Sequence, residues 1–339
     1  MSDKSRKLEI ALASALAKEL GKQIAIADLH RLTGGASRET WSFEAVDQEG
    51  NRLPLILRLD FSGGWSGNLE AMIGESAGLD RAGEYALFNH LYESRIPIPR
   101  PICLPDPSTG LKDCFIMERL AGEGRPRKIL REEAYRTARG ALTAELGDVL
   151  ARIHRLDARK LPTVPVRSTE QQIETFQRLL ALGQASRPVF ELALRWLREH
   201  VPSLKDGPRL VHGDFRNGNF LVTPEGLRAV LDWEYAHLGD PMEDLGFLCM
   251  KPWRFGNTQL DVGGFGSRDE LFSAYEKAGG GRVDPDAVLF WEVLGTVKWG
   301  ALCIIRAMIH INGVQRSVEA AAIGRRVSET EFDLINLIG

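Results

Sequence analysis

The sequence predicts an α+β protein with two lobes, a small β-rich N-terminal lobe and a larger, mostly helical C-terminal lobe. Three strand-like apolar runs lie before residue 60, and turn residues such as Gly34-Gly35 separate them. Long helical patterns begin after Ala121–Gly124, where the character of the chain changes. We therefore predict an N-terminal lobe over residues 1–118, a linker over 119–124 and a helical lobe over 125–339.

The predicted N-terminal lobe starts with a helix and continues as short strands. Leucines at every fourth position predict a helix over 6–20, which Gly21 ends. The predicted strands are Ile24–Leu32, Thr40–Val46, Leu53–Leu59, Ile102–Leu104 and Cys114–Glu118. Between the third and fourth strands we expect a mobile loop over 61–79, rich in Gly and Ser, and a helix over 81–94.

The predicted C-terminal lobe is helical on both sides of a short β-type block. Helical patterns cover 132–156 and 170–199, the β-type block spans 210–231, and mostly helix follows. The most apolar region is Ala287–Ile311, but it contains Glu292, Lys298 and Arg306. Three charges within one such stretch predict a buried helix and argue against a membrane span.

Composition describes an ordinary globular protein. The chain has 339 residues, of which 44% are apolar and 26% charged, and its net charge is −3. This balance offers no bulk attraction to nucleic acid, so we expect no nucleic-acid partner.

Cysteine usage and the N-terminus point to a reduced compartment. No two cysteines form a Cys-x-x-Cys pair, so a zinc site or redox pair is not predicted. We expect all four to be buried as small apolar residues, Cys103, Cys114, Cys249 and Cys303. The first residues lack the apolar stretch of a signal peptide, which leads us to expect a cytoplasmic protein without a membrane partner.

The segment His212–Asn219 (HGDFRNGN) has a pattern suited to phosphoryl transfer. That reaction needs a carboxylate that orients the attacking hydroxyl and accepts its proton, and metal ligands that hold the nucleotide phosphates. Asp214 and Asn219 have the spacing that kinases use for base and magnesium ligand (219 − 214 = 5). Asp232 follows the apolar run Ala229–Leu231 and is the second predicted magnesium ligand.

A simpler alternative is that Asp214, Asn217 and Asn219 only stabilise turns, as such side chains often do. An isolated Asp-x-x-x-x-Asn would favour that alternative. The order of the surrounding segments favours the kinase interpretation, because the strand-like Leu210-Val211 precedes the loop and a later strand ends at Asp232.

These blocks resemble the aminoglycoside phosphotransferase and choline kinase superfamily, whose members have a bilobal protein-kinase-like fold. His212-Gly213-Asp214 resembles the family's catalytic loop, and Asp232-Trp233-Glu234 resembles its counterpart of the Asp-Phe-Gly metal motif. Gly239–Leu245 and Ala151–Asp157 are similar to two further blocks, so the resemblance covers about residues 24–335. Within the superfamily, the chain looks most like the broad bacterial group related to kinase-like domains of acyl-CoA dehydrogenase family proteins.

The resemblance implies a nucleotide site in the N-terminal lobe. Gly34, Gly35 and Ser37 would belong to a phosphate-covering hairpin, although an ordinary β-turn explains the two glycines equally. Arg58 takes the place of the kinase lysine that holds the nucleotide phosphates, and it would pair with Glu84 of the following helix. A surface arginine and a solvated glutamate are the alternative.

The resemblance also implies a hinge strand and a braced catalytic loop. Main-chain groups of Glu118 and Arg119 would bond the adenine edge, and Met117 would pack nearby. His212 would brace the catalytic loop. His154 fits no zinc motif, and a structural hydrogen bond at a helix end is the expected role.

The acceptor site in this superfamily is built by C-terminal helices, which here offers Trp291, Lys298, Trp299 and Arg306 as candidate lining residues, with a core role as the alternative. Polycationic acceptors need a wall rich in carboxylates. Residues 251–339 hold 10 Lys and Arg against 11 Asp and Glu. This balance favours a neutral or anionic acceptor.

We therefore predict an ATP- and magnesium-dependent phosphotransferase that acts on a hydroxyl group of a small molecule, and we favour a metabolite such as a hydroxyacyl-CoA. One alternative is an O-phosphotransferase for aminoglycosides or other antibiotics. A second is a nucleotide-binding pseudokinase, which would be expected to lack the base or a metal ligand, whereas Asp214, Asn219 and Asp232 are all present. The sequence leaves the oligomeric state open.

Overall fold

The computed structural model describes residues 3–32, 38–60, 78–183, 186–204, 207–313 and 316–339. The chain forms two compact units. Unit 1 consists of Met1–Glu123 together with the short segments Lys160–Val164 and Arg228–Tyr235. Unit 2 consists of Gly124–Arg159, Pro165–Leu227 and Ala236–Gly339. The segment that carries Asp232 therefore belongs to unit 1, although it lies far along the chain.

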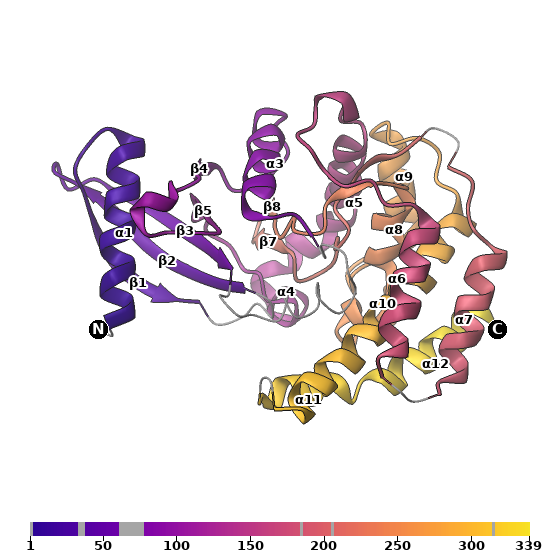
Figure 1. Ribbon diagram of the computed structural model, residues 1–339. Coiled ribbons are helices and arrows are strands. Elements are labelled where there is room, and N and C mark those ends of the chain that lie inside the picture. Colours follow the sequence, from indigo (N-terminus) through magenta and orange to yellow (C-terminus); the bar gives the residue numbers. More distant parts are fainter. Residues whose placement is uncertain (1–2, 33–37, 61–77, 184–185, 205–206, 314–315) are drawn as a thin grey trace. The chain divides into compact units, whose positions relative to one another are not determined.

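Unit 1 is built on a five-stranded antiparallel sheet with the strand order β1-β2-β3-β5-β4 (Figure 1). The strands are β1 (Ile24–Arg31), β2 (Arg38–Asp47), β3 (Arg52–Asp60), β4 (Pro101–Cys103) and β5 (Cys114–Glu118). Two helices accompany the sheet, α1 (Asp3–Leu20) and α3 (Arg81–Glu93).

Alternation along the strands gives the sheet two apolar faces. Leu55 and Leu57 of β3 form one core with Leu12 and Leu16 of α1. On β5, Phe115 instead packs against Phe88 of α3, with 5.2 Å between the ring centroids. Because successive side chains of a strand point to opposite faces, Arg58 points away from the face that carries Leu57.

Unit 2 is mostly helical. Its helices are α4 (Pro126–Arg131), α5 (Arg136–His154), α6 (Thr169–Ala181), α7 (Pro188–Glu199), α8 (Met242–Cys249), α9 (Arg268–Lys277), α10 (Pro285–Ile311), α11 (Val318–Gly324) and α12 (Val327–Ile338). The chain also has short 3-10 helices at Pro107–Thr109, Glu133–Tyr135, Ala158–Lys160 and Lys251–Arg254. The short strands β6 (Arg209–Val211) and β9 (His237–Gly239) pair with each other. A further two-stranded sheet pairs β7 (Phe220–Thr223) with β8 (Gly226–Val230), whose last three residues are counted with unit 1.

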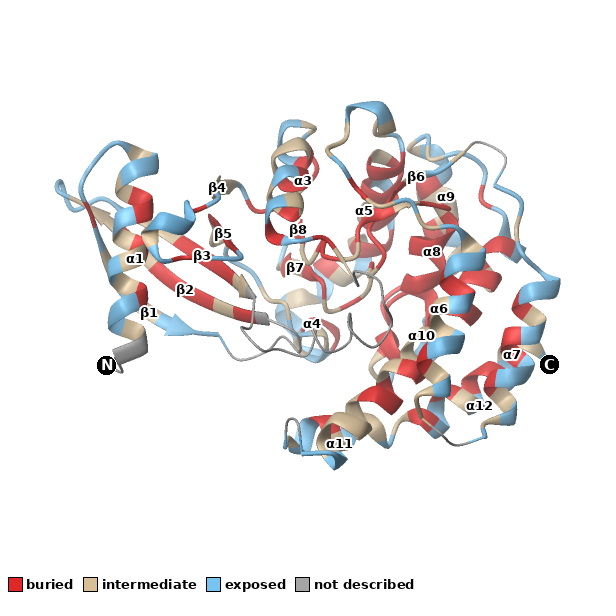
Figure 2. Ribbon diagram, in the orientation of Figure 1, coloured by how far each residue is buried: buried red, intermediate tan, exposed pale blue. Residues whose placement is uncertain are grey.

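Helix α10 runs through the core of unit 2. It packs against α8, α11 and α12, and most of its residues are buried (Figure 2). Gly246 lets α8 approach closely, because a Cβ there would lie 2.7 Å from the Val288 carbonyl oxygen. Among the described residues, α10 alone is long and apolar enough to span a membrane, but 78% of its most apolar window is buried inside the protein. The prediction of a buried helix is confirmed.

One sequence prediction needs refinement. The helical pattern over 170–199 is not a single helix, because α6 ends at Ala181 and α7 begins at Pro188. Proline is favoured in the first turn of a helix, where its missing N–H costs nothing. The prediction for the cysteines is confirmed, since all four are buried and none forms a disulfide.

Candidate functional site

The buried carboxylate of Asp244 fixes the loop that follows β6. The main-chain N–H groups of His212 and Gly213 donate to the two carboxylate oxygens of Asp244, at 2.8 and 3.0 Å. Asp244 lies in the first turn of α8, and its Oδ2 is also 3.1 Å from Nε2 of His154. The other ring nitrogen of His154 lies 2.9 Å from the Tyr275 hydroxyl. His154 thus has a structural role, as the sequence predicts.

Electrostatics keep the Asp244 carboxylate ionised despite its burial. Burial by itself disfavours the charged form. The hydrogen bond and charge of His154, together with the charge and N–H of His212, outweigh that effect and lower the pKa of Asp244. A charged acceptor of two main-chain N–H groups fixes the path of the loop before Asp214.

Asp214 is bonded to two side chains of its own loop. The Asn219 amide Nδ2 donates to the Asp214 carbonyl oxygen at 2.9 Å and to its carboxylate Oδ2 at 2.6 Å. Arg216 Nε donates to both carboxylate oxygens, at 3.0 and 3.2 Å. The Nδ1 of His212 accepts from the Asp214 N–H at 3.2 Å, which fits the predicted bracing role. Arg216 was missed from the sequence, although its position two residues after Asp214 was a usable signal.

In unit 1, Asp232 lies two residues after the end of β8 and has a left-handed backbone conformation, with φ at 68°. Few residues other than glycine adopt this conformation without strain, although aspartate is among the more tolerant. The Asp232 carboxylate forms an ion pair with Arg58 of β3, and its side chain remains 33% exposed.

Arg58 pairs with Glu84, as the sequence predicts. Its Nη1 lies 3.5 Å from the Glu84 carboxylate Oε1, and Glu84 is also bonded to Arg81. Burial disfavours the charge on Arg58, but the nearby carboxylates, led by Glu84 and Asp232, outweigh it and raise the pKa of the guanidinium. The Arg58 guanidinium thus lies between the carboxylates of Glu84 and Asp232, two residues of the predicted site.

The main-chain N–H groups at the predicted hinge are paired within the protein. The Glu118 N–H donates to the Arg100 carbonyl at 2.9 Å, and the Arg119 N–H donates to the Pro54 carbonyl at 3.0 Å. The Arg119 guanidinium bonds to Ser42 Oγ and Glu44 Oε1 of β2. These two N–H groups are therefore paired within unit 1, and an adenine contact by main-chain groups of Glu118 and Arg119 stays a prediction.

Other predicted nucleotide residues give less information. Met117 is buried on β5, and its predicted packing beside a nucleotide stays a prediction. Gly34, Gly35 and Ser37 lie outside the described residues, as does most of the segment expected to form a mobile loop.

The predicted acceptor residues all lie on α10 but have different surroundings. Trp291 is buried, and its indole N–H donates to Asp240 Oδ2 at 2.9 Å, which favours the core alternative. Lys298 lies about two turns further along α10, and its Nζ donates to the Gly213 carbonyl at 2.9 Å. Trp299 packs on Trp253, with 5.0 Å between ring centroids. Arg306 is half-buried nearer the end of the helix. Lys298 and Trp299 therefore lie close to the Asp214 loop.

The donor set suits magnesium better than a transition metal. Within the described ranges, no group of three His, Cys, Asp or Glu side chains could hold a metal ion by itself. Magnesium needs few protein ligands because it keeps waters and nucleotide phosphate oxygens. The Asn219 Nδ2 faces Asp214, which leaves its amide oxygen for a metal, and the Asp232 carboxylate is partly exposed.

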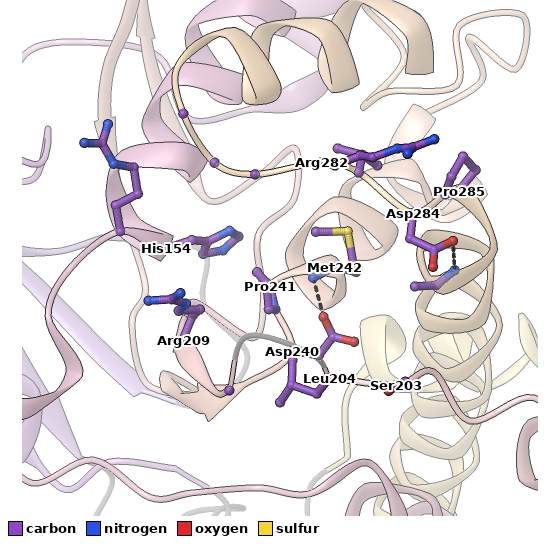
Figure 3. Close-up of a pocket in the computed structure, with 17 residues that line it drawn as sticks. His154, Ser203, Leu204, Arg209, Asp240, Pro241, Met242, Arg282, Asp284 and Pro285 are labelled. Atoms are coloured by element: carbon purple, nitrogen blue, oxygen red, sulfur yellow. Dashed lines mark hydrogen bonds between the residues drawn. The ribbon is translucent and has the colours of Figure 1, made fainter.

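Unit 2 also has a cavity of about 710 Å³ that none of the predicted site residues lines. Figure 3 shows His154, Arg209 and Asp240 around it, with the Met242 N–H bonded to Asp240 Oδ1 at 2.9 Å. Burial raises the pKa of Asp240. His154 lines this cavity and also contacts Asp244, which binds the loop before Asp214.

The family model of the phosphotransferase enzyme family matches residues 28–287. The chain belongs to this family. Membership of a phosphotransferase enzyme family agrees with the arrangement of the Asp214 loop.

Several known proteins are similar to this family member. Acyl-CoA dehydrogenase family member 11 of Pongo abelii is 27% identical over 212 residues, which cover 57% of this chain and 26% of that protein. Acyl-CoA dehydrogenase family member 10 of Mus musculus is 26% identical over 234 residues, covering 66% of this chain and 20% of that protein. The chain thus spans only about a quarter of the length of these relatives.

Solved structures of low sequence identity share the fold. A predicted aminoglycoside phosphotransferase from Ralstonia eutropha has a TM-score of 0.72 at 21% identity, with 97% of each chain covered. A choline/ethanolamine kinase family protein from Mesorhizobium loti has a TM-score of 0.65 at 20% identity, covering 99% of this chain and 95% of that one. Spectinomycin phosphotransferase, solved with ADP and spectinomycin, has a TM-score of 0.64 at 16% identity, covering 96% and 97%. The predicted kinase-like fold is confirmed.

Proposed function

We propose that this phosphotransferase moves the γ-phosphoryl group of ATP to a hydroxyl group of a small metabolite, with Asp214 as the base. The observation that carries the proposal is the double hydrogen bond from Asn219 to Asp214. It fixes the carboxylate beside an amide oxygen that is free to hold a metal. The acceptor oxygen forms the new bond to the γ-phosphorus, ADP leaves with the electrons of the broken bond, and Asp214 takes the hydroxyl proton.

ATP and magnesium are the proposed cofactors. Asn219 and Asp232 would hold the metal through oxygen atoms, and Arg58 would steady phosphate oxygens with a permanent charge. Bound magnesium would neutralise charge that develops on the phosphoryl oxygens. The ADP complex of spectinomycin phosphotransferase, which shares the fold, supports nucleotide use.

For the acceptor we propose a hydroxyacyl-CoA or a related hydroxy acid. The named relatives are acyl-CoA dehydrogenase family members, and this chain matches only a part of each. Two domains joined in one polypeptide are expected to act on related substrates. The balanced charge of residues 251–339, with 10 basic and 11 acidic residues, agrees with an acceptor that is not polycationic.

An ADP-release assay with magnesium and ATP tests this proposal. The acceptors are 3-hydroxybutyryl-CoA, 3-hydroxybutyrate, choline and kanamycin, and Asp214→Asn is the control enzyme. We expect release with a hydroxyacyl compound and loss of that release in the variant. Turnover of kanamycin alone would identify an aminoglycoside phosphotransferase, and ATP binding without turnover of any acceptor would identify a pseudokinase.

A further inference from the structure

An aromatic cluster adjoins the Asp214 loop in unit 2. Phe247, Met250 and Trp253 are buried together, and Trp299 of α10 packs against them. The ring centroids are 5.9 Å apart for Phe247 and Trp253, and 5.0 Å apart for Trp253 and Trp299. Of the residues in this cluster, only Trp299 is a candidate from the sequence, because Phe247 and Trp253 come from segments without a motif.

Two polar atoms of this cluster lack a partner. The indole Nε1 atoms of Trp253 and Trp299 are both buried, and neither has a hydrogen-bond acceptor among the described residues. A buried tryptophan usually bonds its N–H, and an unpaired buried donor is costly. Trp291 of the same unit shows the usual case, since its indole N–H donates to Asp240. Two neighbouring exceptions beside a reactive loop point to an acceptor atom supplied by a ligand.

Cations of the protein already cover the aromatic faces. The Arg216 guanidinium carbon lies 4.5 Å from the centroid of the Trp253 ring, and Lys298 Nζ lies 4.8 Å from the centroid of the Phe247 ring. Arg326 lies 5.8 Å from the Trp299 ring in the same way. An aromatic cage for choline must leave its faces open to the ligand cation. Here a cationic ligand would meet like charges instead.

The same cations touch the reacting loop. Arg216 donates to the Asp214 carboxylate at 3.0 Å, and Lys298 donates to the Gly213 carbonyl at 2.9 Å. Asp214, Arg216 and Trp253 thus form a continuous chain of contacts, and Trp299 extends it. A ligand oxygen bonded to the indole N–H groups would be near the group that accepts the hydroxyl proton.

We propose that Trp253 and Trp299, flanked by Arg216 and Lys298, form an acceptor subsite that binds a carbonyl or carboxylate oxygen of the hydroxyl substrate. The inference rests on the proposed function and adds the residues that recognise the acceptor. The indole N–H groups donate to that oxygen, and the two cations favour its negative or partial negative charge. Choline and aminoglycosides lack such an oxygen and carry the wrong charge for this subsite.

Two single substitutions remove the donors and keep an aromatic ring, Trp253→Phe and Trp299→Phe. Trp196→Phe on α7 is the matched control, because its ring stacks on His200, 4.2 Å between centroids, and lies outside the cluster. Binding is measured by calorimetry with 3-hydroxybutyryl-CoA and with 3-hydroxybutyrate, which separates a thioester carbonyl from a free carboxylate. Circular dichroism melting shows whether each variant is folded.

We expect wild type and Trp196→Phe to bind one of the two probes, and each cluster variant to bind it roughly tenfold more weakly. Where turnover is measurable, KM for that probe rises by the same factor while KM for ATP stays constant. Unchanged affinity in both folded cluster variants overturns the subsite, as does choline binding as tight as that of the probes. Tight binding that the variants weaken, without ADP release, supports the subsite and contradicts the proposed function alone.

Discussion

The amide of Asn219 donates to Asp214 twice, to the main-chain carbonyl at 2.9 Å and to the carboxylate Oδ2 at 2.6 Å. One side chain thereby fixes both the backbone and the carboxylate of the proposed base. The amide must point its nitrogen at Asp214 to do so, which leaves its oxygen as the atom that could bind the proposed metal. Spacing of five residues along a tight loop makes this contact possible.

The first prediction concerns Asn219. In Asn219→Ala, a proposed magnesium ligand and a brace of Asp214 are both lost. We expect half-maximal activity to need about 10–100-fold more magnesium, together with a lower kcat. A magnesium titration of acceptor-dependent ADP release measures this. An unchanged magnesium requirement would remove Asn219 from the metal site.

The second prediction concerns the stability of unit 1. Arg58→Met removes the Arg58 ion pairs with Glu84 and Asp232, which leaves Arg81 as the ion-pair partner of Glu84, and the Arg58 side chain is only 10% exposed. Loss of one partner from a buried ion pair costs about 3–5 kcal/mol of unfolding free energy. Arg52→Met is the matched control on the same strand, because its side chain is 60% exposed and its ion pairs with Glu44 and Asp28 are expected to contribute little. Urea unfolding compares the two, and equal stabilities would contradict the prediction.

The third prediction concerns pH. The pKa of Asp244 is lowered in the folded protein from an ordinary value of 3.8. The unfolded chain therefore binds this proton more readily, so the stabilisation by Asp244 is complete well above pH 3.8 and is lost as pH falls through the folded pKa. We expect Asp244→Asn to be much less stable than wild type at pH 7 and the gap to shrink at pH 3. Urea unfolding at both values checks this, and a gap that does not depend on pH would show that the Asp244 charge is unimportant.

The fourth prediction concerns thiol chemistry. Burial raises the pKa of Cys103, Cys249 and Cys303 to about 12 each. Because the thiolate is the reactive form, these thiols should not react in the folded protein at pH 8. Titration with a disulfide reagent is expected to find them only after unfolding. Rapid modification of Cys249 in the native protein would contradict the burial of α8.

Much of unit 1 could be predicted because its signals are local. The alternation on β3 places Arg58 on the face opposite Leu57, and the helix after Asp80 places Glu84 in its first turn, where Arg58 reaches it. The Asp80 side chain caps that helix by accepting from the Gly83 N–H at 2.7 Å. Both signals come from periodicity and caps, which are properties of short segments.

The remainder depends on contacts between distant segments. The hinge N–H groups of Glu118 and Arg119 are paired with Arg100 and Pro54, a register that no single strand reveals. Trp253 contacts the Asp214 loop through Arg216, whose guanidinium packs on the Trp253 ring. Residues without a motif become part of a site in this way, and sequence patterns give no signal for them.

The most direct test of the central proposal is formation of a phosphorylated acceptor by wild type and by Asp214→Asn, at saturating magnesium and ATP. The product from 3-hydroxybutyryl-CoA is detected by mass spectrometry, and circular dichroism confirms that the variant is folded. We predict phosphorylation by wild type and a rate lower by about 10²–10⁴-fold in the variant. A folded Asp214→Asn enzyme that forms the product at the wild-type rate would contradict the role of Asp214.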